Sequence, residues 1–460
     1  MMLLDSFLPV RRLSNLTNID ESKINMNCNN RIQNTSKRIK LFFYYMLVGF
    51  FLACLYHGVL DWMGYSWPWN SFLFNPTDRY NDWYNSVAQA ASVNPYYSSN
   101  HALATYFPVS YVLLKIAVGY GPVTSISIYF LISIILLILV ACIARILIWH
   151  NGDSAFQYTK DALFLVLATL ISYPALFALD RGNIDIWIGL LGAIFVLTQR
   201  TKFWIVGLLF LSLAISLKGY PAVLLLLLVS ERQYMRMIFC SLLAFLISLI
   251  TLYFLWDGFD LNLTGFLSNL NSYYRMYVLG KSSLFASSDP YNMTRAIFFG
   301  LANLWQKFIS PNYVLLPMEV YSASILKVYS LLSLSFATIA AFFVLAIPEV
   351  RWKKVTALCL IALLFPNVSN DYKLCFLFPG LYLFLTESEN SKSEKVTFAL
   401  FCLLMVPKSY LFIAGKPISM IINPLLITGL AYKVMEGGQN WKQAIQMVKC
   451  RLLFNVSTRK

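Results

Sequence analysis

The stretch VTSISIYFLISIILLILVACIARIL, residues 123–147, decides the fold. It carries no charged residue before Arg145, and it exceeds the ~20 apolar residues that an α-helix needs to cross the hydrocarbon of a membrane. Similar stretches recur along the chain, which is 58% hydrophobic and only 12% charged. Soluble domains carry about a quarter of their residues as charged ones. The sequence therefore predicts an all-α polytopic membrane protein.

Apolar stretches that are candidates for membrane-crossing helices lie at residues 40–59, 123–147, 162–179, 184–198, 203–217, 219–230, 237–256, 321–347, 355–366, 372–386, 396–413 and 417–434. Several are short, so we expect about 11–13 transmembrane helices. The structure should also contain interfacial helices in the first external loop.

The distribution of Lys and Arg predicts the topology, because short cytoplasmic loops collect positive charge. Placing the N-terminus inside puts most of the 36 Lys and Arg in cytoplasmic segments. Residues 1–38 then form a disordered basic cytoplasmic tail, 39–434 the membrane domain and 435–460 a basic cytoplasmic C-terminal tail. The long external loops are 60–122 and 257–320. The net charge of +15 indicates no nucleic-acid partner, since the cations lie in short clusters between apolar runs.

The first external loop carries two candidate catalytic acids. Residues 74–85 read FNPTDRYNDWYN and include Asp78 and Asp82. Residues 103–118, with Lys115 among apolar neighbours, are typical of an interfacial or re-entrant helix. Taken alone, the two acids could equally be solvated loop residues.

Three further polar islands separate apolar helices on the same predicted side. They are Leu179-Asp180-Arg181-Gly182-Asn183-Ile184-Asp185, Leu217-Lys218-Gly219-Tyr220-Pro221 and Pro366-Asn-Val-Ser-Asn-Asp371-Tyr372-Lys373. Each alone is explained by a helix-terminal ion pair, a snorkelling lysine or a polar turn. Together they place several cations at one membrane depth, where Arg and Lys can bind a phosphate and a nearby carboxylate can act as a base.

The sequence indicates neither a metal site nor a cofactor. The 3 histidines are far apart, and C-x-x-C, H-E-x-x-H and D-x-D patterns are missing. A nucleotide-sugar site is not indicated either, because no Rossmann-type glycine pattern is present.

The order of these motifs along the chain resembles glycosyltransferase family 87. The motifs are Asp82-Trp-Tyr-Asn85, Asn94-Pro-Tyr96, Tyr106-Phe-Pro108, Arg181-Gly-Asn183, Leu217-Lys-Gly-Tyr-Pro221 and Ser369-Asn-Asp-Tyr-Lys-Leu374 with Pro379. The resemblance covers roughly residues 40–430. The family belongs to the C-type superfamily of polytopic enzymes, whose sugar donors are polyprenyl phosphates.

The resemblance implies an inverting transfer of a mannose-like or glucose-like hexose on the outer face of the membrane. Asp82 matches the family's general base, with Asp78 as the second candidate. Arg181, Lys218 and Lys373 match its phosphate-binding cations, although Lys373 matches only a subset of members and the histidine that others carry near Asp371 is missing. The supporting residues would be Asp180, Asn183, Asn85, Tyr220, Asp371 and Tyr372.

The expected partners are a polyprenyl-phosphate sugar, a glycan or glycolipid acceptor and the lipid bilayer. The Asn, Ile, Lys and Tyr bias of the sequence suggests a bacterium, hence undecaprenyl as the lipid and the inner membrane as the location, with both termini cytoplasmic and the active site periplasmic. Two alternatives remain open: a flippase of a lipid-linked saccharide, which should show internal repeats, and an O-antigen polymerase or ligase that uses Arg275, Lys281 and Arg295 of the second loop.

Overall fold

A computed structural model of the chain describes residues 21–65, 79–98, 103–148, 155–254, 257–280, 288–309, 318–388, 391–408, 412–413 and 416–436. The helices before residue 200 are α1 (Glu21–Trp62), α2 (Asn81–Ala91), η1 (Pro95–Tyr97), α3 (Pro108–Leu114), η2 (Lys115–Ala117), α4 (Pro122–Ile148), α5 (Ala155–Leu170), α6 (Tyr173–Arg181) and α7 (Asp185–Thr198). Those that follow are α8 (Trp204–Leu217), η3 (Tyr220–Leu224), α9 (Leu225–Ser230), α10 (Tyr234–Phe254), α11 (Phe259–Tyr273), η4 (Tyr274–Leu279), α12 (Pro290–Ile309), α13 (Met318–Ala346), α14 (Arg351–Leu364), η5 (Asp371–Leu377), α15 (Phe378–Glu387), α16 (Lys392–Met405) and α17 (Ser419–Met435). The two-residue strands β1 (Phe412–Ile413) and β2 (Lys416–Pro417) pair antiparallel.

The described residues confirm the all-α polytopic prediction. Four helices, α1, α4, α10 and α13, are long and apolar enough to cross a membrane, and the bent pair of α5 and α6 would make a fifth span. Most of the other predicted stretches fall on apolar helices of 10–17 residues or on helices interrupted by a turn. The expected 11–13 spans therefore exceed what helix length and composition alone support.

One predicted boundary differs. Helix α1 begins at Glu21, whereas residues 1–38 were expected to be a disordered tail. Residues 21–38 are polar but contain no Pro or Gly, so nothing in them interrupts a helix that continues into the apolar part of α1. Within α1, Ser36 donates to Asp161 of α5, and Arg38 donates to the carbonyl of Leu385 in α15.

Helix α7 lies in the centre of the bundle and packs against α4, α8, α15 and η5. All of its residues are buried, as expected for a helix that is apolar on every side. Gly189 permits the closest approach, because a Cβ there would stand 2.3 Å from the carbonyl oxygen of Cys375 in η5. A glycine thus brings η5 against the beginning of the central helix.

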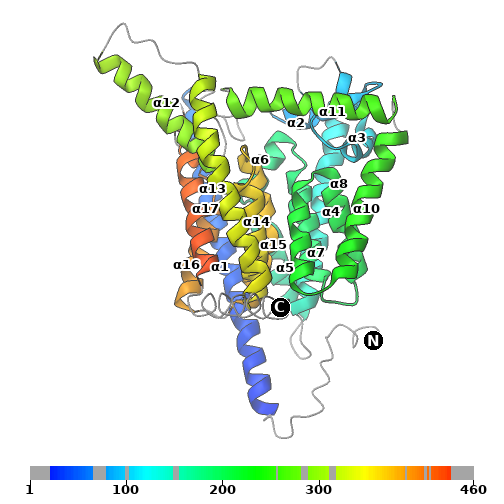
Figure 1. Cartoon of the computed structure of the whole chain (residues 1–460). Helices are drawn as coiled ribbons and strands as arrows, with labels where there is room; N and C mark the ends of the chain where they lie inside the picture. The colour runs from blue at the N-terminus through cyan, green and yellow to red at the C-terminus, as the bar shows by residue number, and fades with distance from the viewer. Residues whose placement is uncertain are drawn as a thin grey trace, which may run out of the picture.

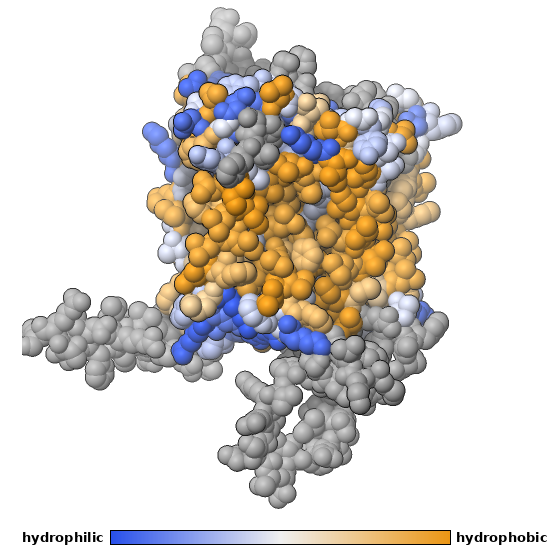
Figure 2. Space-filling view, turned by 90° about the vertical axis from the view of Figure 1, so that its right-hand side faces the viewer, coloured by the Kyte–Doolittle hydropathy of each residue, from blue (hydrophilic) through white to orange (hydrophobic). Residues whose placement is uncertain are grey.

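The long helices run side by side, and α2, α3 and α11 lie across one end of them (Figure 1). We call this the loop end. The turns that follow α7 and α9, and the one before α14, meet at the opposite end, which we call the turn end. A broad apolar band separates hydrophilic residues at the two ends (Figure 2). The polar islands and the Lys- and Arg-rich turns therefore lie at opposite ends of the bundle, as the topology prediction requires.

The interfacial helix expected at 103–118 corresponds to α3 and η2. A helix of this length extends only about 15 Å, half the ~30 Å of membrane hydrocarbon. Pro108 begins α3, and Gly119, with φ of 84°, follows η2. This short segment lies at the loop end and does not span.

Candidate active site

Asp82 stands in the first turn of α2 with its carboxylate directed at the end of α6. Its Oδ2 accepts a hydrogen bond from Asn183 Nδ2 at 2.8 Å. Within the described residues its Oδ1 accepts none, and the side chain is half-buried. Burial raises the pKa of the Asp82 carboxyl above its ordinary value, while the Asn183 hydrogen bond and the Lys218 charge oppose that rise. One carboxylate oxygen is thus available to an incoming proton donor.

Trp83, the next residue, holds α2 in place. It is buried, its Nε1 donates to Ser125 Oγ at 2.9 Å, and its ring packs against Trp187. Gly182 packs against Trp83, and a Cβ at Gly182 would stand 2.4 Å from the Trp83 Cβ. Its φ of 68° lies in the left-handed region, which favours glycine. The glycine of the Arg-Gly-Asn motif therefore lets α2 contact the α6–α7 turn.

Asn183 joins the first loop to the cations. Its carbonyl accepts a hydrogen bond from the buried Tyr129 hydroxyl at 2.9 Å. Its Oδ1 accepts from the backbone N–H of Asp185 at 3.0 Å and from Lys218 Nζ at 3.3 Å. The amide group thus donates to Asp82 on one side and accepts from Lys218 on the other.

Asp185 occupies the centre of this cluster, although the sequence assigns it no role in the site. Its Oδ2 lies 2.8 Å from Lys218 Nζ, and its Oδ1 accepts from the Tyr220 hydroxyl at 2.6 Å. The Lys218 ammonium also lies 4.6 Å from the centre of the Tyr106 ring. The sequence signal was an acidic residue at the first position of an otherwise fully apolar helix.

Lys373 enters from η5, the fourth segment of the cluster. Its Nζ lies 4.6 Å from the centre of the Tyr220 ring and 3.5 Å from Ser369 Oγ, and the side chain is buried. Tyr372 stacks on Phe177 of α6, and its ring centre lies 5.9 Å from Lys218 Nζ. The structure therefore brings Asp82, Asn183, Lys218, Tyr220, Tyr372 and Lys373 together.

Arg181 and Asp180 border the cluster at the end of α6. Arg181 interacts electrostatically with Tyr372 and with Tyr277 of η4. The Asp180 carbonyl accepts a hydrogen bond from the backbone N–H of Tyr80 at 2.7 Å, and its carboxylate interacts with the Arg79 charge. Asp180 thus holds the segment that leads into α2, whereas Arg181 interacts with Tyr372 of the cluster.

Two predicted supporting residues lie away from the cluster. Asn85 donates to Asn81 Oδ1 one turn earlier in α2. Asp371 is fully buried and accepts hydrogen bonds from side chains of α6, α17 and the residues before α12: Tyr173, Ser288, Ser419 and Asn423. It anchors η5 and does not face Asp82. Asp78 lies outside the described residues.

A protein-family model, Glycosyltransferase family 87, matches residues 104–369, more than half of the chain. The chain belongs to this family. It is thus a membrane glycosyltransferase, as the motif order predicted. No curated protein and no solved structure matches it.

The matched residues cover part of the candidate site. They include Asn183, Asp185 and Lys218 but end before Asp371 and begin after Asp82. The hydrogen bond from Asn183 to Asp82 therefore connects the candidate base to the matched part of the chain.

Proposed function

We propose that the protein transfers a mannose-like or glucose-like hexose from a polyprenyl-phosphate donor to a glycan or glycolipid, with inversion, at the loop end of the bundle. The observation that carries this proposal is the cluster in which Asn183 links the Asp82 carboxylate to Lys218. Asp82 is the base, because its Oδ1 accepts no hydrogen bond from the part of the chain that the structure describes, whereas both oxygens of Asp185 already accept hydrogen bonds.

The transfer is a single displacement. The acceptor hydroxyl attacks the anomeric carbon as Asp82 takes its proton, an effect typically worth about 100- to 10,000-fold. The bond between the anomeric carbon and the phosphate oxygen breaks, and polyprenyl phosphate leaves with its electron pair. Arg181, Lys218 and Lys373 oppose the charge that develops on the phosphate, so the reaction needs no metal or other cofactor.

The fold supports a lipid-linked donor. A polyprenyl chain can remain in the bilayer beside the apolar band while its phosphate reaches the headgroup depth of the cluster. Arg295 of the second loop donates to the carbonyls of Tyr277, Leu279 and Gly280. Arg295 is therefore used within the protein, which speaks against its part in a polymerase-like role. Arg275 is exposed, and Lys281 lies outside the described residues.

The test is transfer of radiolabelled sugar by purified protein from a panel of polyprenyl-phosphate sugars to membrane extracts of a bacterium with an AT-rich genome. We expect a labelled product that persists in EDTA, a loss of at least about 100-fold in Asp82→Asn, and normal activity in the exposed control Asp260→Asn. Full activity in Asp82→Asn would remove it as the base. No product with any donor, together with sugar-lipid movement across vesicles, would replace the enzyme by a flippase.

A further inference from the structure

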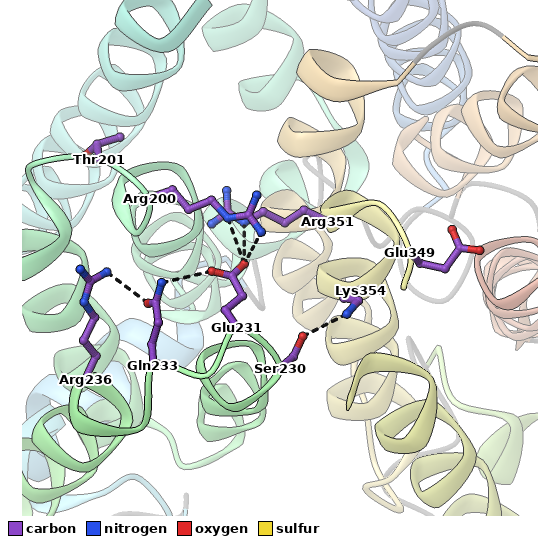
Figure 3. A pocket seen from close by; sticks show the side chains of 9 residues that line it. All are labelled: Arg200, Thr201, Ser230, Glu231, Gln233, Arg236, Glu349, Arg351 and Lys354. Atoms are coloured by element: carbon purple, nitrogen blue, oxygen red, sulfur yellow. Dashed lines mark hydrogen bonds and ion pairs between the residues drawn. The ribbon is translucent and has the colours of Figure 1, made fainter. Parts of the chain in front are cut away.

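A second polar site lies at the turn end, far from the cluster described above. A cavity of about 600 Å³ opens between the α7–α8 turn, the α9–α10 turn and the beginning of α14. It is lined by Arg200, Thr201, Ser230, Glu231, Gln233, Arg236, Glu349, Arg351 and Lys354 (Figure 3). Its size is that of a small-molecule site.

The carboxylates of this cavity are already engaged. Figure 3 shows Arg200 and Arg351 converging on Glu231, whose Oε1 lies 2.7 Å from Arg200 Nη2 and 3.6 Å from Arg351 Nε. Glu349 lies 3.1 Å from Lys353, outside the lining. The short ion pairs of both acids are therefore formed with cations other than Arg236 and Lys354.

Arg236 and Lys354 are the cations left with neutral partners. Arg236 Nη1 donates to the Gln199 carbonyl and to Gln233 Oε1, both at 3.1 Å. Lys354 Nζ donates to Ser230 Oγ at 3.1 Å. Within the described residues neither forms an ion pair. Lys354 also interacts electrostatically with Glu231 and Glu349. The four cations of the lining nevertheless outnumber its two acids, so the cavity carries a net positive charge.

The position of Arg236 indicates which anion can balance the positive charge of the cavity. It lies in the first turn of α10, a candidate span with little of its surface covered by protein. Met235 and Phe239 beside it are exposed, and its guanidinium lies 4.2 Å from the centre of the Trp204 ring. Tryptophan and arginine gather at the membrane interface, so the cavity opens at headgroup depth beside an apolar surface.

We propose that this cavity binds the phosphate of an anionic phospholipid headgroup, with Arg236 and Lys354 as its counter-ions and the acyl chains along the exposed face of α10. Basic pockets between membrane helices bind anionic headgroups in this way. The site is separate from the proposed transfer chemistry and holds the turns after α7 and α9 against α14.

The test compares delipidated protein with phosphatidylglycerol, with phosphatidylcholine of the same acyl chains and with inorganic phosphate, by native mass spectrometry. We expect saturable retention of phosphatidylglycerol and weak binding of the other two. Arg236→Gln/Lys354→Gln should weaken that retention by about 10- to 30-fold. The matched control Lys160→Gln/Lys392→Gln removes two exposed charges outside the cavity and should bind as wild type.

Equal retention by the cavity variant and the wild type would overturn the proposal, as would saturation by inorganic phosphate without a preference for the anionic lipid. The unfolding temperature in phosphatidylcholine checks that the double variant is folded. If it is not, Lys354→Gln alone should weaken retention about 5-fold, and no weakening there would also refute the site.

Discussion

The two aspartates of the cluster differ in what surrounds them. Asp185 accepts from Lys218 and Tyr220, which fix its carboxylate inside the protein. Asp82 accepts only from Asn183 among the described residues. Asp185 therefore positions the Lys218 cation, whereas Asp82 keeps an oxygen that can accept a proton. The hydrogen-bond partners thus give the two aspartates different roles.

Asn183→Ala should move the acid limb of the activity profile to higher pH. The Asn183 amide stabilises the ionised form of Asp82, which must be unprotonated to act as a base, so its loss raises the Asp82 pKa further above the ordinary value. A hydrogen bond of this kind is worth about 0.5–1.5 kcal/mol, or up to about one pH unit.

The measurement is kcat/KM against pH for the wild type and Asn183→Ala, with Asn85→Ala as the control on α2. In the described parts of the chain Asn85 donates only to Asn81, so the profile of Asn85→Ala should not move. An acid limb at the same pH in Asn183→Ala would show that Asp82 does not control it.

At this scale the sequence singled out Asp82, Lys218 and Lys373, which the structure brings together, but it predicted neither their pairing nor the places of Asp185 and Asp371. Lys218 and Lys373 were recognisable because charges beside apolar helices are costly unless used. Asp185 was overlooked because it stands two residues after Asn183 in the same short motif, and only the position of Lys218 on another hairpin distinguishes it. Asp371 looked like a neighbour of the cations in sequence, yet the turn of η5 directs it into the protein.

At the scale of elements, the contact between α2 and the α6–α7 turn decides whether Asp82 lies within hydrogen-bond distance of Asn183. Gly182→Ala should destabilise the protein by about 2–4 kcal/mol, because it adds strain in the left-handed region and a clash with Trp83. It should also lower kcat, because Asp82 is displaced from Asn183. A change in KM alone would not account for the loss of kcat/KM. The measurements are thermal unfolding and transfer kinetics.

Gly119→Ala is the matched control. Gly119 also has a positive φ, of 84°, but a Cβ there meets nothing within 4 Å. Its loss should cost only about 1–2 kcal/mol and leave transfer intact. If both variants behave alike, backbone strain alone matters and the close contact with Trp83 does not.

The sequence predicts the position of a helix well when the helix is long and apolar. It predicts less well whether a short apolar helix spans the membrane, because that depends on which neighbours bury it. The stretch at 123–147 is α4, because a long uncharged run has one solution in a membrane. Whether short runs such as α7 span depends on neighbours that cover them, which a single sequence does not contain. The start of α1 also required the structure, since residues 21–38 are mostly polar and lack the apolar length that marks a span.

At the scale of the whole molecule, the two ends of the bundle have different tasks. The loop end gathers the candidate catalytic groups, whereas the turn end holds Glu231 between Arg200 and Arg351. Glu231 is partly buried, and burial alone would raise the pKa of its carboxyl. The hydrogen bond and charges of Arg200 and the charge of Arg351 outweigh burial and lower that pKa below its ordinary 4.5.

The stabilisation from Glu231 should therefore depend on pH in a defined direction. A carboxyl whose pKa is lowered by folding stabilises the protein fully above the unfolded value, about 4.5, and loses that contribution as the pH falls through the folded value. Glu231→Gln should thus be less stable than the wild type by about 1–3 kcal/mol at neutral pH, and the difference should shrink below pH about 4.5. Thermal unfolding of both proteins from pH 7 to pH 3 measures it, with the exposed Glu319→Gln as a control for loss of one charge. A difference that stays constant over this range, or one that Glu319→Gln reproduces, would mean that the arginines at the turn end do not depend on the Glu231 charge.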